Sequence, residues 1–291
     1  MPLSPHNIAH FFTVDVEEHF QVSAFEGIVE RESWATQPSR VERNVDRALA
    51  LLADANATAT FFTLGWVAER RPALVRRIAE CGHEIASHGM THRRVYHLSS
   101  AEFRDELRTS KRLLEDITGT HVVGFRAPNF SILPRSEWAF EVLVEEGYRY
   151  DSSRFPIHRI DYGSPDAPSD VHVVTCPSGT LLEFPLATYK AFGARIPAAG
   201  AAYLRHFPYR VVRGAFAQSE RRGQAAVFYI HPWELDPEQP RIDAPLLTRW
   251  RHYTGLSRTT ARVARLLGEF RFTSFRARLE RPAPRDAVLV A

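Results

Sequence analysis

A regular alternation of short apolar runs and amphipathic helical segments is the feature that most constrains how this chain can fold. The apolar runs are rich in β-branched and aromatic residues, which is typical of buried strands. The predicted strands are residues 9–14, 58–64, 83–86 and 121–125, and the predicted helices are residues 39–52, 67–80, 100–118 and 134–146. Repeated strand–helix units predict an α/β fold with a parallel sheet or a barrel at its centre.

Signals for helix ends support these boundaries. Ser39 and Glu42 have the spacing of a capping box, and so do Ser99 and Glu102. Glycines follow three of the helical segments, at Gly82, Gly119 and Gly147. Glycine is the residue that most often ends a helix, because it adopts the left-handed conformation without a steric cost.

The second half of the chain has a looser pattern. Six prolines interrupt residues 150–202, which predicts loops and short strands. A buried strand is predicted at residues 225–230 and a helix at residues 250–270, and the last dozen residues are predicted to be frayed or extended. The chain has 291 residues, 44% of them hydrophobic, so we expect residues 1–291 to form a single domain with a basic C-terminal extension from about residue 241.

Cysteine content and hydropathy indicate the compartment. Cys81 and Cys176 lie far apart in the sequence, which argues against a disulfide framework and against a thiolate metal site. No apolar run approaches the roughly 20 residues that cross a bilayer. The N-terminus lacks the basic start and apolar core of a signal peptide. We therefore expect a cytoplasmic protein without a transmembrane segment.

The charge is unevenly distributed. Residues 241–291 hold 11 arginines, no lysine and 4 acidic residues, whereas the whole chain has a net charge of only +3. A basic segment can meet an anionic glycan, a nucleic acid or a membrane surface, although a solvated arginine-rich helix face is the more common explanation. We expect no nucleic-acid partner and keep a peripheral membrane contact as an alternative. The oligomeric state is left open.

Two histidines suggest a metal site. His88 and His92 are four positions apart, so both imidazoles can face one divalent cation from a helical turn or from the turn leading into one. Two unrelated histidines would show the same spacing. The surrounding sequence favours the metal, because Asp15, Arg126 and His231 also follow predicted strands. In a barrel of strand–helix units, groups at the carboxyl ends of successive strands meet in one site.

The order of these motifs resembles a known family. The motifs are Asp15-Val-Glu17, His88-x-x-x-His92, Arg126-x-Pro128 and an aromatic-Ile-His231 strand, and this order is similar to that of the polysaccharide deacetylases of carbohydrate esterase family 4, which have the NodB-homology fold. The stretches 15–21, 125–132, 150–153 and 231–240 resemble the subgroup associated with exosortase and exopolysaccharide loci. The resemblance implies a distorted (β/α)7-type barrel, a divalent metal held by an acid and two histidines, and N-deacetylation of acetylated sugars.

The implied metal centre uses Glu17, His88 and His92 as ligands. Two imidazoles and one carboxylate leave coordination positions open, which is the pattern of catalytic zinc. Zinc lowers the pKa of bound water from about 15.7 towards about 7 and polarises a carbonyl group. We expect Zn²⁺ first and keep Co²⁺, Ni²⁺ and Mn²⁺ as alternatives, because affinity order alone does not select a metal.

The acidic motif departs from the common family form, in which two aspartates are adjacent. If the strand continues to Glu17, its period of two places Asp15 and Glu17 on one face and Glu18 on the other. This favours Asp15 as the general base and Glu17 as the ligand. Glu18 is the alternative ligand if the backbone curls at the end of the strand.

The remaining assignments also follow from the resemblance. Arg126 corresponds to the family arginine that holds the catalytic aspartate, and Asn129 stands where a backbone N–H of the family stabilises the oxyanion. His231 corresponds to the general acid that protonates the leaving amine. Trp233 is a candidate for stacking on a sugar ring. Asp151 either orients His231 or makes a local turn with the serines that follow it.

These assignments predict a metal-dependent hydrolase that removes N-acetyl groups from N-acetylhexosamine units of an exopolysaccharide or its precursor. Its partner is then an N-acetylated polysaccharide or oligosaccharide. Two alternatives are an allantoinase-like hydrolase of a small cyclic amide and a non-catalytic glycan-binding protein of the same fold.

Overall fold

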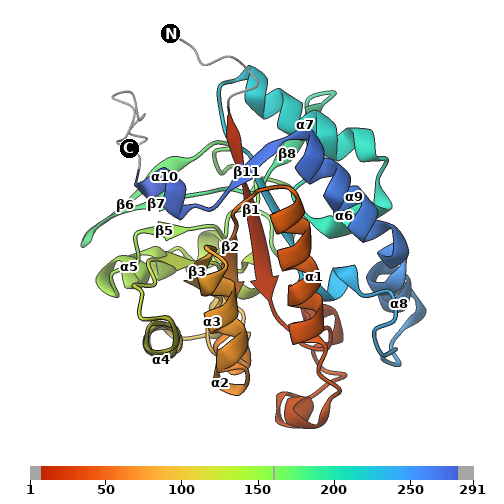
Figure 1. Ribbon diagram of the computed structural model, residues 1–291. Coiled ribbons are helices and arrows are strands. Elements are labelled where there is room, and N and C mark those ends of the chain that lie inside the picture. The colour runs from red at the N-terminus through yellow and green to blue at the C-terminus, as the bar shows by residue number, and fades with distance from the viewer. Residues whose placement is uncertain (1–7, 160, 281–291) are drawn as a thin grey trace.

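A mostly parallel sheet forms the centre of the computed structural model, which describes residues 8–159 and 161–280 (Figure 1). The strands are β1 (Ala9–Val16), β2 (Thr60–Thr63), β3 (Glu84–Ser87), β4 (Gly124–Phe125), β5 (Tyr150–Asp151), β6 (His172–Cys176), β7 (Gly179–Glu183), β8 (Thr188–Ala191), β9 (Ala194–Pro197), β10 (Val227–Ile230) and β11 (Arg271–Thr273). The α/β fold expected from the sequence is confirmed.

The strands are arranged as a strongly curved sheet. Among the described residues, nine strands form one sheet in the order β10-β1-β2-β3-β4-β5-β7-β6, with β11 also paired to β1, while β8 and β9 form a separate hairpin. All pairs of the large sheet are parallel except β6 with β7. Single parallel bridges link Leu186 to Val227 and Gly200 to Tyr229. Seven parallel strands, from β10 through β5 to β7, thus surround the centre, and these bridges connect its two ends.

Helices lie outside the sheet, with α1 to α4 in the lower part of the view and α6, α7 and α9 to the right (Figure 1). Their bounds are α1 (Val41–Asp54), α2 (Gly65–Arg70), α3 (Pro72–Glu80), α4 (Ser100–Thr118), α5 (Trp138–Glu145), α6 (Ala201–His206), α7 (Tyr209–Arg221), α8 (Leu246–Tyr253), α9 (Leu256–Glu269) and α10 (Arg276–Leu279). No helix in residues 8–159 or 161–280 is long and apolar enough to span a membrane.

Two helices that the sequence predicts as continuous are broken in the structure. The predicted helix at residues 67–80 is divided into α2 and α3 at Pro72, because proline cannot donate the hydrogen bond that a helix interior requires. The predicted helix at residues 250–270 starts earlier and is divided into α8 and α9 by Gly255, which has a left-handed φ of 79°. The predicted strand at residues 121–125 is reduced to β4.

The two predicted capping boxes have different outcomes. Ser99 and Glu102 form the predicted box at the start of α4. At the start of α1, however, the Ser39 hydroxyl donates to Glu18 instead of capping the helix, and the backbone N–H of Arg40 also donates to the Glu18 carboxylate, at 2.9 Å. Glu18 therefore supplies the negative charge at this helix N-terminus, a distant partner that local spacing cannot reveal.

Much of the described part of the segment from about residue 241, which the sequence analysis treats as a basic C-terminal extension, packs against the rest of the fold. Strand β11 pairs with β1, and α9 packs against α6 and α1. Phe275 is fully buried and its ring lies 4.2 Å from that of Phe184. One hydrophobic cluster includes Val263, Leu266 and Leu267 of α9, Phe272 of β11 and Phe275, so this part of the segment belongs to the main core. The frayed ending predicted for the last dozen residues lies outside the described residues, apart from Glu280.

Two buried carboxyl groups meet where β5 pairs with β7. Asp151 and Glu183 are opposite each other in the ladder and both are fully buried. Burial and the neighbouring Asp151 carboxylate raise the pKa of Glu183 well above its usual value. Protonated Glu183 can donate a hydrogen bond to Asp151, while its other oxygen accepts from the backbone N–H of Arg154 at 2.9 Å.

We predict that this pair lowers stability as the pH rises. The folded-state pKa of Glu183 lies above its unfolded value of about 4.5, so its stabilising contribution is complete below pH 4.5 and is lost as the pH rises through the folded-state pKa. Glu183→Gln should therefore become more stable relative to wild type between pH 5 and pH 8, by up to about 1.4 kcal/mol per pH unit. Urea unfolding at several pH values measures the difference. The exposed control Glu69→Gln should show a constant difference, and a constant difference for Glu183→Gln would contradict the prediction.

Candidate metal centre and active site

Polar residues at the carboxyl ends of three parallel strands face one open cavity of about 360 Å³. Asp15 lies on β1 and Glu17 just beyond it, His88 follows β3, and His231 follows β10. Seven of the nine site residues predicted from the sequence line this cavity, namely Asp15, Glu17, His88, His92, Asn129, His231 and Trp233. The other two, Arg126 and Asp151, are fully buried behind it. The expectation that the strand ends converge is confirmed.

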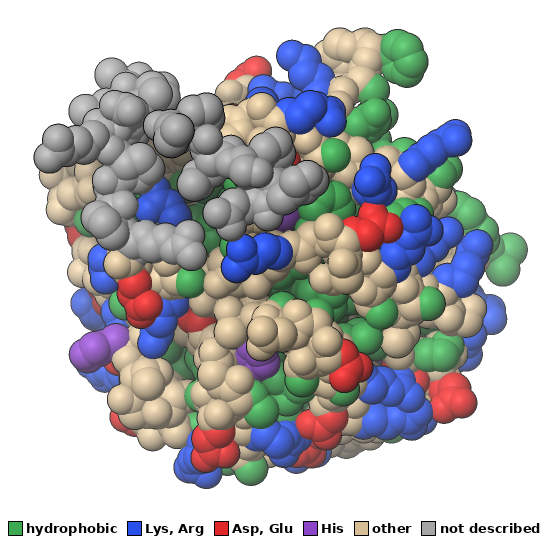
Figure 2. Space-filling model, turned by 45° about the horizontal axis from the view of Figure 1, so that its top comes forward, with side chains coloured by type: hydrophobic (Ala, Val, Ile, Leu, Met, Phe, Trp, Pro, Cys, Tyr) green, Lys and Arg blue, Asp and Glu red, His purple; other side chains and the backbone are tan. Residues whose placement is uncertain are grey.

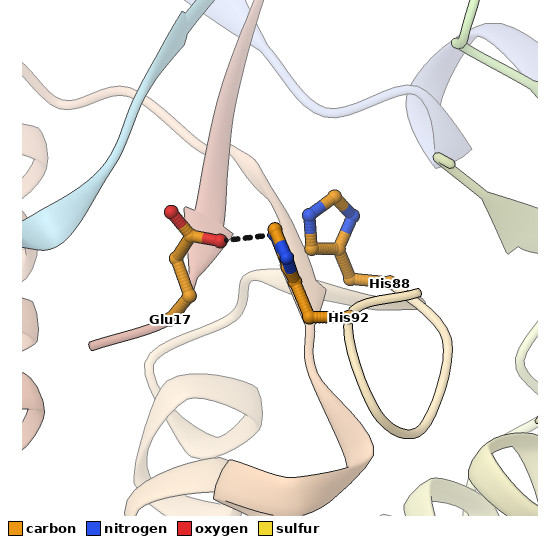
Figure 3. Close-up of side chains that lie close together, drawn as sticks. All are labelled: Glu17, His88 and His92. Carbon is orange, nitrogen blue, oxygen red and sulfur yellow. Dashed lines mark ion pairs between the residues drawn. The ribbon is translucent and has the colours of Figure 1, made fainter. Parts of the chain in front are cut away.

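Glu17, His88 and His92 form a buried cluster (Figure 3). One ligand atom from each residue lies within 4.8 Å of the other two. Oε2 of Glu17 lies 2.6 Å from Nε2 of His92, but this oxygen receives no hydrogen bond of suitable geometry within the described residues. A buried carboxylate oxygen without a donor is costly, so the donor set fits a divalent cation.

Hydrogen bonding fixes the form of His88. Its Nδ1 lies 2.8 Å from the backbone carbonyl oxygen of Arg126, which can only accept, so Nδ1 carries the proton. Burial lowers the pKa of His88 to about 4, which keeps the ring neutral near pH 7. Nε2 therefore retains a lone pair. This is the tautomer that a metal-binding histidine needs.

The charge of Glu17 is also suited to a cation. Burial alone would raise its pKa, but the neighbouring His92 and His231 outweigh burial and lower the pKa to about 2. Glu17 is thus ionised at neutral pH. Glu18 points to the N-terminus of α1, as described above, so the geometry favours Glu17 over Glu18 as the ligand.

The loop from His88 to His92 is not itself a helical turn, and of the two arrangements predicted it is closer to the second, a turn that leads into a helical segment. Gly89 and His92 have positive φ values of 76° and 56°, and the loop continues into a short 3-10 turn at Val95–His97. Glu106 of α4 holds the loop, because its carboxylate accepts the backbone N–H groups of Met90 at 2.6 Å and Thr91 at 2.9 Å. A left-handed histidine in such a loop is a strained feature typical of functional sites.

Arg126 contacts Asp15 as predicted. Its Nη1 donates to Oδ1 of Asp15 and to the Thr13 hydroxyl, both at 2.7 Å. Its Nε and Nη2 donate to the carbonyl and hydroxyl oxygens of Ser152 at 3.0 and 2.8 Å. The guanidinium is fully buried and lies over the ring of Phe62. These contacts fix Asp15 in one orientation, with Oδ2 left towards His231.

His231 lies between two sets of carboxylates. Its Nε2 is 3.6 Å from Glu17 and 4.0 Å from Asp15, and its Nδ1 is 3.2 Å from Oε2 of Glu234. Burial alone would lower its pKa, but Glu17, Glu234 and Asp15 outweigh burial and raise the pKa to about 9. His231 is therefore a cation near pH 7. Its Nδ1–H faces Glu234 and its Nε2–H faces the cavity.

Glu234 and Arg205 were missed at the sequence level. Glu234 lies in the 3-10 turn Pro232–Leu235, and its carboxylate also accepts the backbone N–H of His231 at 3.0 Å. The i,i+3 spacing after a strand-end histidine was a usable signal for this contact. Arg205 of α6 donates to Glu234 at 3.3 Å from 29 residues away, and nothing in the local sequence indicates that pairing.

Stacking of Trp233 on a sugar ring stays a prediction, and the ring already has extensive contacts within the protein. The Trp233 ring is only 5% exposed and lies parallel to the rings of His231, at 5.2 Å, and His252, at 4.2 Å. Its Nε1–H donates to Glu17 at 3.3 Å. Trp233 therefore supports the ligand carboxylate and the histidine, and has little surface left for a substrate.

Asp151 does not orient His231. Its carboxylate accepts the backbone N–H and the hydroxyl of Ser153, both at 2.8 Å, which is the turn that the sequence analysis gave as the alternative. Glu234 takes the place at His231 that was predicted for Asp151. Asn129 lines the cavity with a left-handed φ of 54°, a conformation that asparagine tolerates better than most residues.

Comparisons with known proteins follow the two halves of the chain. Residues 34–150 match the family model described as polysaccharide deacetylase, and residues 152–280 match a domain of unknown function, DUF3473. The chain is 30% identical over 112 residues to a peptidoglycan deacetylase of Helicobacter pylori, which covers 38% of this chain and 37% of the relative. It is 38% identical over 96 residues to a chitooligosaccharide deacetylase of Bradyrhizobium sp., which covers 33% and 42%.

A third relative is a peptidoglycan-N-acetylglucosamine deacetylase of Bacillus cereus, with 34% identity over 87 residues that cover 30% of this chain and 32% of the relative. The matches thus span between 32% and 42% of the length of these three relatives.

Solved structures are similar over most of the chain. A protein of Mycobacterium smegmatis described as a polysaccharide deacetylase has a TM-score of 0.61 at 20% identity, covering 100% of this chain and 98% of its own.

The structure of Puue allantoinase has a TM-score of 0.59 at 17% identity, covering 94% of this chain and 88% of its own. At these identities the structures show the fold alone. The fold and the cavity define an α/β protein with a candidate metal centre at the carboxyl ends of its strands. Residues 34–150 are similar to the polysaccharide deacetylase family, and two of the curated relatives are deacetylases of peptidoglycan.

We predict that Glu17 and Glu18 differ as metal ligands. Glu17→Gln replaces a charged donor by a neutral amide and should lower zinc affinity by at least about 100-fold, and His92→Ala should do the same. Glu18→Gln should keep the zinc, because that carboxylate contacts α1. Metal content after reconstitution and dialysis, measured by mass spectrometry, tests the difference. Loss of zinc from Glu18→Gln with zinc retained by Glu17→Gln would reverse the assignment.

Proposed function

We propose that this protein is a metal-dependent N-deacetylase that acts on N-acetylhexosamine units of a polysaccharide or its precursor. The observation that carries the proposal is the arrangement of three groups in one cavity. These are the cluster of Glu17, His88 and His92, the Asp15 carboxylate fixed by Arg126, and the His231 cation on the other side of Asp15.

A divalent cation held by Glu17, His88 and His92 would supply an activated water and polarise the amide carbonyl. We propose Zn²⁺ as the physiological ion, with Co²⁺, Ni²⁺ and Mn²⁺ as alternatives. The support is the donor set of one ionised carboxylate, one imidazole of fixed tautomer and a second imidazole, all buried.

Asp15 is suited to take a proton from the attacking water. Its Oδ1 is occupied by Arg126, which holds the carboxylate in place, and its Oδ2 faces the cavity side. His231 is suited to give a proton to the leaving amine from Nε2, since its Nδ1 is held by Glu234. Amide hydrolysis requires a group that accepts a proton from water and a group that donates one to the leaving amine. The backbone N–H of Asn129 is our candidate for an additional oxyanion donor.

The substrate class is supported by the relatives. The curated proteins similar to this chain include deacetylases of peptidoglycan and of chitooligosaccharides, whose substrates carry N-acetylated sugars. We extend this to an exopolysaccharide substrate, to the exosortase-associated subgroup and to a cytoplasmic location, on the sequence patterns given above. Hydrolysis of a small cyclic amide is the second candidate, because the chain shares the fold of an allantoinase. Glycan binding without catalysis is the third.

We predict acetate release from N-acetylated oligosaccharides by the zinc-reconstituted protein. Release should stop with a chelator and return with zinc. Asp15→Asn should keep the metal and reduce kcat by about 10³-fold, because the amide cannot accept the proton. The same assay is run on allantoin and other cyclic amides as alternative substrates. Turnover of a cyclic amide with no acetate release would establish the second candidate, and glycan binding with no turnover would establish the third. Wild-type rates in Asp15→Asn would exclude Asp15 as the base.

We predict that His231→Ala reduces kcat by about 10²- to 10³-fold with zinc content unchanged. Substrates with a better leaving group, such as an acetyl ester, should be affected less, because they need less protonation. Loss of zinc from His231→Ala would instead indicate a ligand role. An equal loss for the amide and the ester would contradict the role of His231 as general acid.

A further inference from the structure

Helix α8 exposes apolar side chains to solvent. Leu246, Leu247 and Trp250 are 82%, 57% and 56% exposed, and they account for three of the five large hydrophobic side chains that are exposed within residues 8–159 and 161–280. Monomeric proteins rarely leave such side chains together on one element without a partner. His206 packs against part of the Trp250 ring, with centroids 5.2 Å apart, which leaves more than half of the side chain open.

The two faces of α8 have different roles. Thr248, Arg251 and His252 line the cavity, whereas Leu246, Leu247 and Trp250 do not. At 3.6 residues per turn, positions 246 and 250 share one face and positions 248 and 252 share the opposite one. Leu246 and Trp250 therefore lie on the outer face of a helix whose inner face is a wall of the active-site cavity, and the exposed Leu247 lies at the edge of that outer face.

Positive charge surrounds this outer face. Arg249 and Arg251 are exposed on α8, and the guanidinium of Arg241 lies 4.1 Å from the ring of Tyr253 in the same helix. Asp243 is the acidic residue beside them, 3.7 Å from Arg249. Helix α8 lies at the right-hand edge of the molecule in Figure 1. Figure 2 shows the surface after a turn about the horizontal axis. In that view, Lys and Arg side chains alternate with hydrophobic side chains along the right-hand edge of the molecule.

We propose that the outer face of α8 docks on an anionic membrane surface. Leucine and tryptophan side chains on one face with arginines beside them are the composition of helices that lie in a bilayer interface. Tryptophan prefers the headgroup level, and arginine is attracted to anionic lipids. A partner that is only apolar would not account for the arginines, and a nucleic acid would not account for the two leucines.

This docking has a consequence for the substrate, which rests on the proposed function. One face of α8 lines the cavity and the other would contact the membrane. Only the width of the helix, about 10 Å, would then separate the cavity from the lipid surface. The substrate class that this placement favours is an acetylated glycan still attached to a lipid carrier in the membrane. Membrane docking would not bring the active site any closer to a free polysaccharide in solution.

Vesicle binding tests the proposal without any activity measurement. The wild-type protein should co-sediment with vesicles of phosphatidylglycerol and phosphatidylcholine, but much less with phosphatidylcholine alone, and high salt should weaken binding. The triple variant Leu246→Ser, Leu247→Ser, Trp250→Ser should bind at least about 10-fold more weakly, and Arg249→Gln should weaken binding to a smaller extent. Since all of these side chains are exposed, unchanged thermal unfolding is expected.

Phe192→Ser is the matched control, because Phe192 is fully exposed at the tip of the hairpin formed by β8 and β9. It should bind vesicles like wild type. Absence of wild-type binding to anionic vesicles, or equal binding by the triple variant, would overturn the proposal. A wild-type dimer that the triple variant cannot form, with no vesicle binding, would assign the face to a second copy of the chain and would also overturn it.

The consequence for the substrate has its own measurement. Acetate release from an N-acetylchitooligosaccharide on a phospholipid anchor in anionic vesicles should be faster for wild type than for the triple variant, with equal rates for the same glycan free in solution. Equal rates on both substrates would remove the inference about lipid-linked glycans. Release from neither substrate, with vesicle binding intact, would instead count against the proposed function.

Discussion

The buried ion pair between Arg126 and Asp15 is the interaction on which the site depends. The two side chains belong to strands that are separated in the sheet by β2 and β3, yet their atoms are 2.7 Å apart, so the sheet must curve around them. An unpaired guanidinium at this position would cost several kcal/mol. The guanidinium of Arg126 has three partners: Thr13 and Asp15 on β1, and Ser152 just after β5. These partners lie on strands to either side of β4, which Arg126 follows. The contacts that close the fold therefore also orient the base.

Periodicity predicted the part of this arrangement that depends on local geometry. The period of two predicted that Asp15 and Glu17 share one side, and both do line the cavity while Glu18 contacts the start of α1, although β1 ends at Val16 instead of continuing to Glu17. His88 and His92 do not share a helical turn but lie in a loop that leads into a 3-10 turn, and the shape of this loop is set by left-handed residues and by Glu106 from α4. The contacts that Trp233 and Asp151 make across the fold could not be predicted for the same reason. Their partners, His252 and Glu183, are fixed by tertiary packing that spacing does not encode.

The site needs both halves of the chain, although the family models divide it between residues 150 and 152. The first half supplies Asp15, the candidate metal ligands and Arg126. The second half supplies His231 on β10, which pairs with β1, and much of the cavity wall, including α8. Because β10 is hydrogen-bonded directly to the strand that carries Asp15, the acid and the base are placed by one ladder. The region matched by a domain of unknown function is thus part of the same candidate site.

A chain of alternating charges connects the candidate acid to the wall of the cavity. His231 is held by Glu234, Glu234 by Arg205, and Arg205 also donates to the carbonyl oxygens of Arg251, His252 and Thr254 at the end of α8. Helix C-terminal carbonyls have no partner within the helix, so these bonds fix where α8 ends. A displacement of α8 would move Arg205, and with it the carboxylate that sets the orientation of His231. Buried Arg205 therefore couples the position of α8, which lines the cavity, to the orientation of His231, the candidate proton donor.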